Sequence, residues 1–136
     1  MAEAAEAADS PRGASTWRRA ARLGAAELGR EPGERATLVQ FSTAFCRPCR
    51  ATRAVLAHAA GLVPGVAHVE IDAEAHLALV RALGVERTPT VLVLDAGGHE
   101  VRRAAGQPRV ADVIAALGEA MAAPRGLDPG RGTSPG

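Results

Sequence analysis

Aromatic side chains are almost missing from this sequence of 136 residues, which contains two Phe, one Trp and no Tyr. The core must therefore be aliphatic, and a hydrophobic content of 47% is enough for one domain. No stretch approaches about 18 uninterrupted apolar residues, so we expect no membrane-spanning helix. Net charge is nearly absent as well, since 16 Lys and Arg stand against 15 Asp and Glu. No basic patch with interleaved aromatics indicates nucleic-acid binding.

Cysteine is scarce too, and the two that exist, Cys46 and Cys49, are separated by only two residues. A zinc site needs about four ligands, but no second closely spaced pair is formed by the other candidates, which are His58, His68, His76 and His99. A structural disulfide that closes so short a loop would remove little chain entropy from the unfolded state. Two buried small hydrophobes are the remaining alternative. We favour a redox-active pair over all of these, and expect no metal and no organic cofactor.

The two cysteines lie between an apolar run at 38–41 and a run of helix-forming residues. In a helix they would share one face, and Cys46 would lie at the helix start, where free N–H groups and the helix dipole stabilise a thiolate. Pro48 is tolerated in a first turn. Arg47 and Arg50 are unfavourable for a helix at that end, but they favour a thiolate. The pattern is typical of a thiol–disulfide active site.

The N-terminal part of the chain gives weaker signals. Residues 1–16 are rich in Ala, Glu, Pro and Gly, and we expect them to be disordered. Residues 17–29 fit either a short helix or an edge strand, with Trp17 packing this segment onto the domain. The first residues are acidic and lack the basic-then-apolar order of a secretory signal. We therefore expect a reducing, cytoplasmic setting, where a lone C-x-x-C is more often catalytic than structural.

The rest of the chain alternates between strand-like and helix-like patterns. Strands are predicted where apolar residues run together or alternate with polar ones, at 37–42, 66–72, 90–94 and 99–105. Helices are predicted at 46–60, 73–83 and 108–123, with Gly61 and Gly84 ending the first two. The apolar stripe of the second helix consists of Leu77, Val80 and Leu83. Turns are expected at 31–34 and 95–98, and a frayed tail at 124–136.

The predicted order is β-α-β-α-β-β-α, with the cysteines directly after the first strand. A βαβ unit followed by an antiparallel hairpin and a last helix predicts an α/β fold, in which helices flank both faces of a central mixed β-sheet. We expect three parts along the chain. They are an N-terminal extension at 1–34 that is largely disordered at its start, one domain at 35–122 and a flexible C-terminal tail at 123–136.

These patterns together carry a family resemblance. The run Leu38-Val39-Gln40-Phe41, followed by Phe45-Cys46-Arg47-Pro48-Cys49-Arg50, is similar to the strand and active-site loop of thioredoxins. The strand at 66–72 ends in Asp, as the family's next strand commonly does. The loop at 84–90 matches the family loop that contains a proline, and Gly106 matches a glycine beside it. The region from 37 to about 120 therefore resembles a thioredoxin-like fold.

The resemblance implies roles for individual residues. Cys46 would attack a substrate disulfide, and Cys49 would resolve the mixed disulfide that results. Pro89 would follow a cis peptide bond and face the cysteines, and the backbone of Thr88 would pair with the substrate strand. Gly106 would lie beside this substrate-binding loop.

Four positions depart from the family pattern. Phe45 and Arg47 stand where the family usually has Trp and Gly. Gln40 corresponds to the buried acid that helps to deprotonate the second cysteine, and His68 to the lysine near that acid. Losing both partners together is physically sensible, because either one alone would be a buried unpaired charge. The family's first strand and helix also look truncated or absent.

We therefore predict a monomeric thiol–disulfide oxidoreductase that reduces or exchanges protein disulfides, with electrons from an NADPH-dependent thioredoxin reductase. The support residues are expected to be Phe45, Arg47, Pro48, Gln40 and His68. The other histidines are expected at the surface. The rival hypothesis is a non-catalytic binding module or chaperone, which Gln40 and Phe45 favour slightly and the intact C-x-P-C disfavours.

Overall fold

A computed structural model describes residues 22–122 and contains one four-stranded sheet in the order β3-β2-β4-β5. The strands are β2 (Ala36–Ser42), β3 (Val66–Asp72), β4 (Thr90–Asp95) and β5 (Glu100–Ala105). The helices are α3 (Ala25–Leu28), α4 (Arg47–Leu62), the 3-10 turn η1 (Ala73–Ala75), α5 (Leu77–Leu83) and α6 (Val110–Ala122). The predicted mixed sheet and element order are thereby confirmed.

Strand β2 is central and pairs on both sides. It runs parallel to β3, with Leu38 opposite His68 and Gln40 opposite Glu70. It runs antiparallel to β4, which in turn pairs antiparallel with β5. Parallel pairing requires a crossover, and α4 supplies it between β2 and β3. All seven residues of β2 are buried, as expected for a strand covered on both faces.

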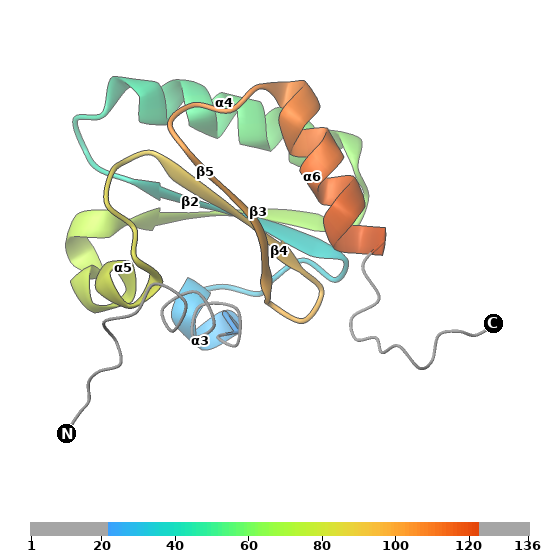
Figure 1. Cartoon of the computed structure of the whole chain (residues 1–136), viewed down its shortest axis with the longest axis horizontal. Helices are drawn as coiled ribbons and strands as arrows, with labels where there is room; N and C mark the ends of the chain where they lie inside the picture. Colours follow the sequence, from blue (N-terminus) through green and yellow to red (C-terminus); the bar gives the residue numbers. More distant parts are fainter. Residues whose placement is uncertain (1–21, 123–136) are drawn as a thin grey trace.

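Helices cover both faces of the sheet. In Figure 1, α4 and α6 lie above it, and α3 and α5 lie below it. Side chains alternate between the two faces along a strand, so Leu38 of β2 belongs to the core cluster beneath α4 and α6, which also includes Leu56 and Leu117. The next residue, Val39, belongs to the opposite cluster.

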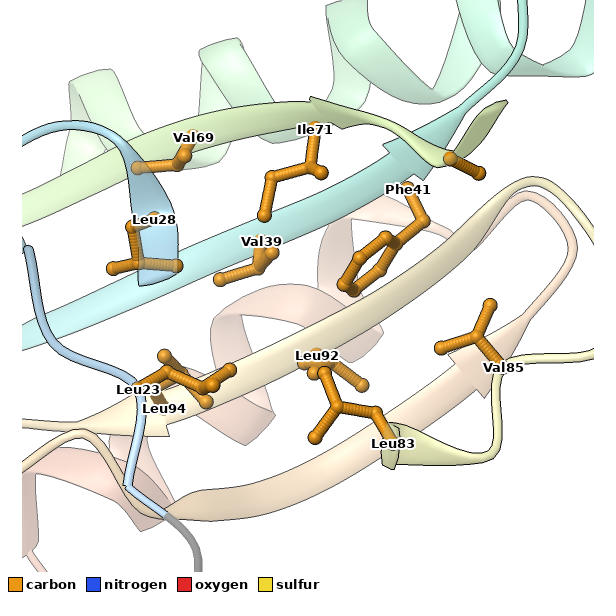
Figure 2. Packing of buried hydrophobic residues seen from close by; sticks show 11 residues of the cluster. Leu23, Leu28, Val39, Phe41, Val69, Ile71, Leu83, Val85, Leu92 and Leu94 are labelled. Atoms are coloured by element: carbon orange, nitrogen blue, oxygen red, sulfur yellow. The ribbon is translucent and has the colours of Figure 1, made fainter. Parts of the chain in front are cut away.

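The core cluster on the face of the sheet opposite α4 and α6, called the lower cluster from here on, includes residues of the N-terminal segment. Figure 2 shows Leu23 and Leu28 packed against β-strand side chains that include Val39 and Leu94. Both leucines are 5% exposed. The packed part of the molecule therefore includes residues ahead of the expected boundary at 35. A short helix and an edge strand were the two alternatives for 17–29, and the described part of this segment, 22–29, contains the four-residue α3 and a single β-bridge between Arg22 and His99. Trp17 lies outside the described residues, as do the expected tail and N-terminal disorder.

Two helix predictions are wrong in detail. Gly61 does not end α4, which continues to Leu62 and has extended backbone at Val63. The reason is the following Pro64, which disfavours helical backbone at the residue before it. The helix predicted at 73–83 is broken at His76, whose φ of −134° and ψ of 53° separate η1 from α5.

The broken helix also changes the predicted apolar stripe. Leu83 is buried and Val80 packs partly against the lower cluster, but Leu77 is 53% exposed. Leu79, which the spacing did not select, contacts that cluster instead. The ending at Gly84 is confirmed, with φ of 68°. Among residues 22–122, no helix combines the length and apolar composition needed to cross a membrane.

Candidate active site

The two cysteines form a disulfide at the start of α4, with a Cα–Cα distance of 5.2 Å. Cys46 is the N-cap residue, and its Sγ accepts a hydrogen bond from the backbone N–H of Cys49 at 3.2 Å. Cys46 is partly exposed, whereas Cys49 is 1% exposed. Cys46 therefore lies partly exposed at a helix N-terminus, as the sequence predicted, and Cys49 is buried behind it.

The local sequence explains this placement. Strand β2 ends at Ser42, and a short turn carries the chain to Cys46, whose extended backbone suits an N-cap. Pro48 occupies the first helical turn, where a backbone N–H needs no intrahelical acceptor. The residues at 47 and 48 are exposed, so they rim the disulfide without burying it.

A second loop lies beside the cysteines. The peptide bond between Thr88 and Pro89 is cis, as expected from the resemblance, and Pro89 is fully buried. The hydroxyls of Thr43 and Thr88 are 3.4 Å apart, so this loop contacts the turn that leads to Cys46. Gly106 donates its N–H to the carbonyl of Pro89 at 2.8 Å and has a φ of 90°. Three segments thus meet at the end of the sheet that carries the disulfide.

Gln40 lies beneath the disulfide and is completely buried. Its Nε2 donates to the carbonyl oxygen of Cys49 at 2.8 Å and to Ser42 Oγ at 2.9 Å. Its Oε1 lies 3.3 Å from His68 Nε2. Because a carbonyl oxygen can only accept, the amide NH₂ must face Cys49, and Oε1 must face the imidazole. His68 therefore donates through Nε2, and the whole amide is satisfied without any charge.

His68 is half-buried, although a histidine on a strand face is more often near solvent. Burial lowers the pKa of His68, because it penalises the charged imidazolium. The carboxylate of Glu70 opposes this shift, and Arg53 and Arg30 add to it. The neutral imidazole is thus the form that fits the buried amide.

An ion pair closes the outer side of this network. Arg53 of α4 donates two hydrogen bonds of 2.7 Å to Glu70 of β3. The bonds from Arg53 are the main cause that lowers the pKa of Glu70, and a hydrogen bond from Ser42 lowers it further. The same ion pair raises the pKa of Arg53. The charged Arg53–Glu70 pair therefore lies at the surface, and the neutral Gln40–His68 pair lies deeper in the protein.

A polar pocket of about 330 Å³ opens next to this ion pair. Its lining comes from the end of β2 and the following turn, from α4 and from the end of β3, namely Ser42, Thr43, Ala44, Arg53, Glu70 and Asp72. Within the described ranges, no group of three or more His, Cys, Asp or Glu residues is arranged to hold a metal ion.

Of the ten residues singled out in the sequence, the structure places seven in the disulfide, the buried network and the adjoining loop, namely Cys46, Cys49, Gln40, His68, Thr88, Pro89 and Gly106. The other three, Phe45, Arg47 and Pro48, adjoin the disulfide along the chain but are exposed, Phe45 completely. Three further residues of the site, Ser42, Arg53 and Glu70, were not predicted from the sequence. Two signals could have found them. Strand alternation puts Glu70 on the same face as His68, and Arg53 lies four residues after Cys49 on one helix face.

Comparison with known proteins gives a consistent result. The family model described as Thioredoxin matches residues 30–119. Thioredoxin H2-1 from Oryza sativa subsp. japonica is 35% identical over 69 residues, which are 51% of this chain and 49% of that protein. The chain thus spans about half the length of the curated relative it matches.

Solved structures agree in fold. A mutant thioredoxin from Halobacterium salinarum NRC-1 has a TM-score of 0.59 at 23% identity, covering 71% of this chain and 80% of its own. Thioredoxin NaTrxh from Nicotiana alata has a TM-score of 0.57 at 24% identity, covering 65% and 75%. These likenesses support the arrangement of sheet and helices.

Proposed function

Because this chain belongs to the thioredoxin family over residues 30–119, we propose that it is a thiol–disulfide oxidoreductase that reduces disulfide bonds in other proteins. The observation that carries the proposal is the Cys46–Cys49 disulfide at the start of α4. A structural cross-link over three residues would contribute little to stability. A disulfide that closes and opens at a partly exposed sulfur is a means of exchanging electrons.

The proposed reaction begins with the reduced dithiol. The thiolate of Cys46 attacks one sulfur of a substrate disulfide, and a mixed disulfide forms while the other substrate sulfur leaves as a thiolate and takes up a proton. Cys49 then loses its proton and attacks Cys46 Sγ. The Cys46–Cys49 disulfide forms, and the second substrate sulfur leaves and is protonated. Two electrons and two protons pass from the protein to the substrate.

The surrounding residues support these steps in the proposal. The N–H of Cys49, which points at Cys46 Sγ, stabilises the thiolate, and Arg47 adds a positive charge nearby. Thr88, ahead of the cis bond to Pro89, offers its backbone to an extended substrate, with Gly106 supporting the loop. Gln40 cannot take a proton, so the proton of Cys49 passes to solvent or to His68. Gln40 instead holds the Cys49 carbonyl in place.

The electron supply and setting belong to the same proposal. An NADPH-dependent thioredoxin reductase returns the disulfide to the dithiol, and family membership supports this choice of donor. We propose a monomer that works in the cytoplasm, since a dithiol that reduces other proteins needs a reducing compartment.

Reduction of insulin, followed by turbidity with dithiothreitol as the terminal reductant, tests the proposed function. The wild-type protein should accelerate precipitation, and Cys46→Ser should abolish the acceleration. Cys49→Ser should instead trap mixed disulfides, which mass spectrometry detects. A wild type no faster than Cys46→Ser would contradict the proposal and favour a non-catalytic binding module or chaperone.

A further inference from the structure

The surface around the exposed sulfur contains an apolar side chain that does nothing for the fold. Phe45, directly before Cys46, is 100% exposed, although a phenyl ring is normally driven out of water. Its position in the sequence puts it in the turn between β2 and α4. Figure 1 shows this turn at the left end of the molecule. A ring left fully in water beside a reactive sulfur is available to a partner.

Two arginines next to this ring are also unfavourable for the fold. Arg47 and Arg50 lie one helical turn apart in the first turns of α4, where like charges repel each other and the helix dipole disfavours cations. Both are exposed, and neither forms a salt bridge within residues 22–122. Other arginines of this protein do have carboxylate partners, namely Arg53, Arg102, Arg103 and Arg109.

The nearby acidic groups do not neutralise these two charges. Glu70 is bound by Arg53, and neither Asp72 nor Glu74 forms a salt bridge with Arg47 or Arg50 in the described part of the chain. Strand β3 lies on one side of β2, and the loop before β4 lies on the other. In that loop, Glu86 is followed directly by Arg87, so its charges balance. The first turns of α4 therefore present a net positive, partly apolar surface.

We propose that this surface selects protein disulfides whose cysteines are flanked by acidic residues, with an apolar substrate side chain against Phe45. Opposite charges attract a segment that approaches Cys46 and hold it for attack, whereas basic segments are repelled. The selection rests on the proposed function, because the surface matters only if Cys46 exchanges with a substrate disulfide. Such selection would explain why Arg47 and Arg50 are present although they do not stabilise the helix and are not part of the core.

Three cyclic peptide disulfides test the preference. They share one sequence, except that the residues flanking the cysteines are Glu, Gln or Lys. At low ionic strength, kcat/KM for the Glu peptide should exceed that for the Lys peptide by about five- to ten-fold. Raising the salt concentration should reduce the ratio, because exposed charges are screened.

Matched variants locate the effect. Arg50→Glu should bring the ratio close to one or invert it. Arg35→Glu is the control, since Arg35 is also exposed but precedes β2 at the end opposite the disulfide, and it should leave the ratio unchanged. Phe45→Ser should raise KM for all three peptides by about three-fold or more without changing the ratio.

Using the ratio removes any general effect on sulfur reactivity, because such an effect slows all three peptides equally. Efficient reduction of all peptides with a ratio near one in wild type would overturn the proposed selection and leave the proposed function standing. An equal loss for every peptide in Arg50→Glu would also overturn it. Failure to reduce even the Gln peptide would overturn the proposed function and this inference together.

Discussion

At the scale of single residues, the site combines a partly exposed cysteine, a buried cysteine and an uncharged buried side chain that supports them. Cys49 is 1% exposed, and its carbonyl is held by Gln40. Gln40 and His68 satisfy each other as neutral groups, which avoids the cost of burying an ion pair. The difference in exposure therefore decides which cysteine can react with a substrate, and the absence of a buried charge limits Gln40 to a supporting role.

The two thiols of the reduced protein should differ in reactivity. We expect iodoacetamide to modify Cys46 at least about ten-fold faster than Cys49, because Cys46 is accessible and receives the Cys49 N–H. Peptide mapping after brief alkylation at neutral pH measures both rates, with the urea-unfolded protein as control. Equal rates in the folded protein would contradict the assignment of Cys46 as the attacking sulfur.

Replacing the buried amide by an acid should destabilise the protein. In Gln40→Glu a carboxyl oxygen must face the Cys49 carbonyl, and we expect a loss of about 3–5 kcal/mol in the free energy of unfolding at neutral pH. Burial raises the pKa of the new carboxyl, so the folded state holds the proton longer than the unfolded state. The loss should therefore grow as pH rises above about 4.3.

Urea unfolding at several pH values measures this effect. Adding His68→Lys should recover a large part of the loss, because the new ammonium lies next to the new carboxylate. A single variant as stable as wild type at neutral pH, or a double variant less stable than the single one, would argue against the geometry described for Gln40.

At the scale of elements, α4 contributes both the buried and the exposed residues of the site. Cys49, Thr52 and Leu56 face the sheet, while the exposed residues of its first turns flank the disulfide. The helix ends because of Pro64, and Gly61 is an ordinary interior position. Two positions in this helix are not optimal for stability.

Gly61→Ala should stabilise the protein by about 0.5–1 kcal/mol. A Cβ at this exposed helical position meets nothing within 4 Å, and alanine has the higher helix propensity. Gly29→Ala is the contrasting variant: its Cβ would also be free of contacts, but φ is 77°, so it should destabilise. Thermal unfolding measures both, and a destabilised Gly61→Ala would mean that α4 ends before residue 61.

Thr52→Val should raise the free energy of unfolding by about 1 kcal/mol. The Oγ1 of Thr52 is buried and has no hydrogen-bond partner in the described part of the chain, and valine removes that hydroxyl at nearly constant volume. Thr37→Val serves as control, because Thr37 is equally buried but its Oγ1 accepts the N–H of Gly33 at 2.9 Å. That variant should lose about 1–3 kcal/mol. Equal effects in denaturant unfolding would show that Thr52 has a partner.

At the scale of the whole molecule, stability and the site depend on the same sheet. Its lower face holds the N-terminal leucines and α5, and its upper face holds α4, α6 and the polar network. The network contains two groups whose pKa values are shifted by folding, His68 and Glu70. The free energy of unfolding should therefore change with pH in two separate pH ranges, one for each group.

His68 controls the upper window. Its pKa is lowered by burial, so below about pH 6.5 the unfolded state binds more protons than the folded state. Stability should fall as pH decreases from about 6.5 through the lower folded pKa, with a slope of at most about 1.4 kcal/mol per pH unit. His68→Gln, which keeps a side-chain donor for Gln40, should remove this slope.

Glu70 provides the comparison. Its lowered pKa places its own loss of stability below about pH 4.5, so Glu70→Gln should change only the acid end of the profile. Denaturant unfolding at pH values from about 3 to 8 separates the two windows. A wild-type profile that is flat between pH 5 and 7 would contradict the burial of His68.

The sequence by itself determined the strands, the order of elements and the dithiol. Strand periodicity and β-branched runs are local signals, so β3 was predicted at its observed bounds, and β2 and β4 within one residue. The strand-to-helix position of the cysteines is likewise local. Helix ends were less secure where a glycine and a proline competed, as at Gly61 and Val63, or where a capped turn at Asp72 preceded a break at His76.

The tertiary structure decided how the polar residues meet, because the family resemblance placed His68 near Gln40 but did not place Arg53 against Glu70. The hydrogen bond from His68 to Gln40 spans 28 positions, and the ion pair of Arg53 with Glu70 spans 17. Both depend on the register of β2 against β3 and on how α4 crosses that face. A shift of one residue would turn every side chain of β3 to the opposite face. Local periodicity cannot encode such a register, because it arises from packing both faces of the sheet at once.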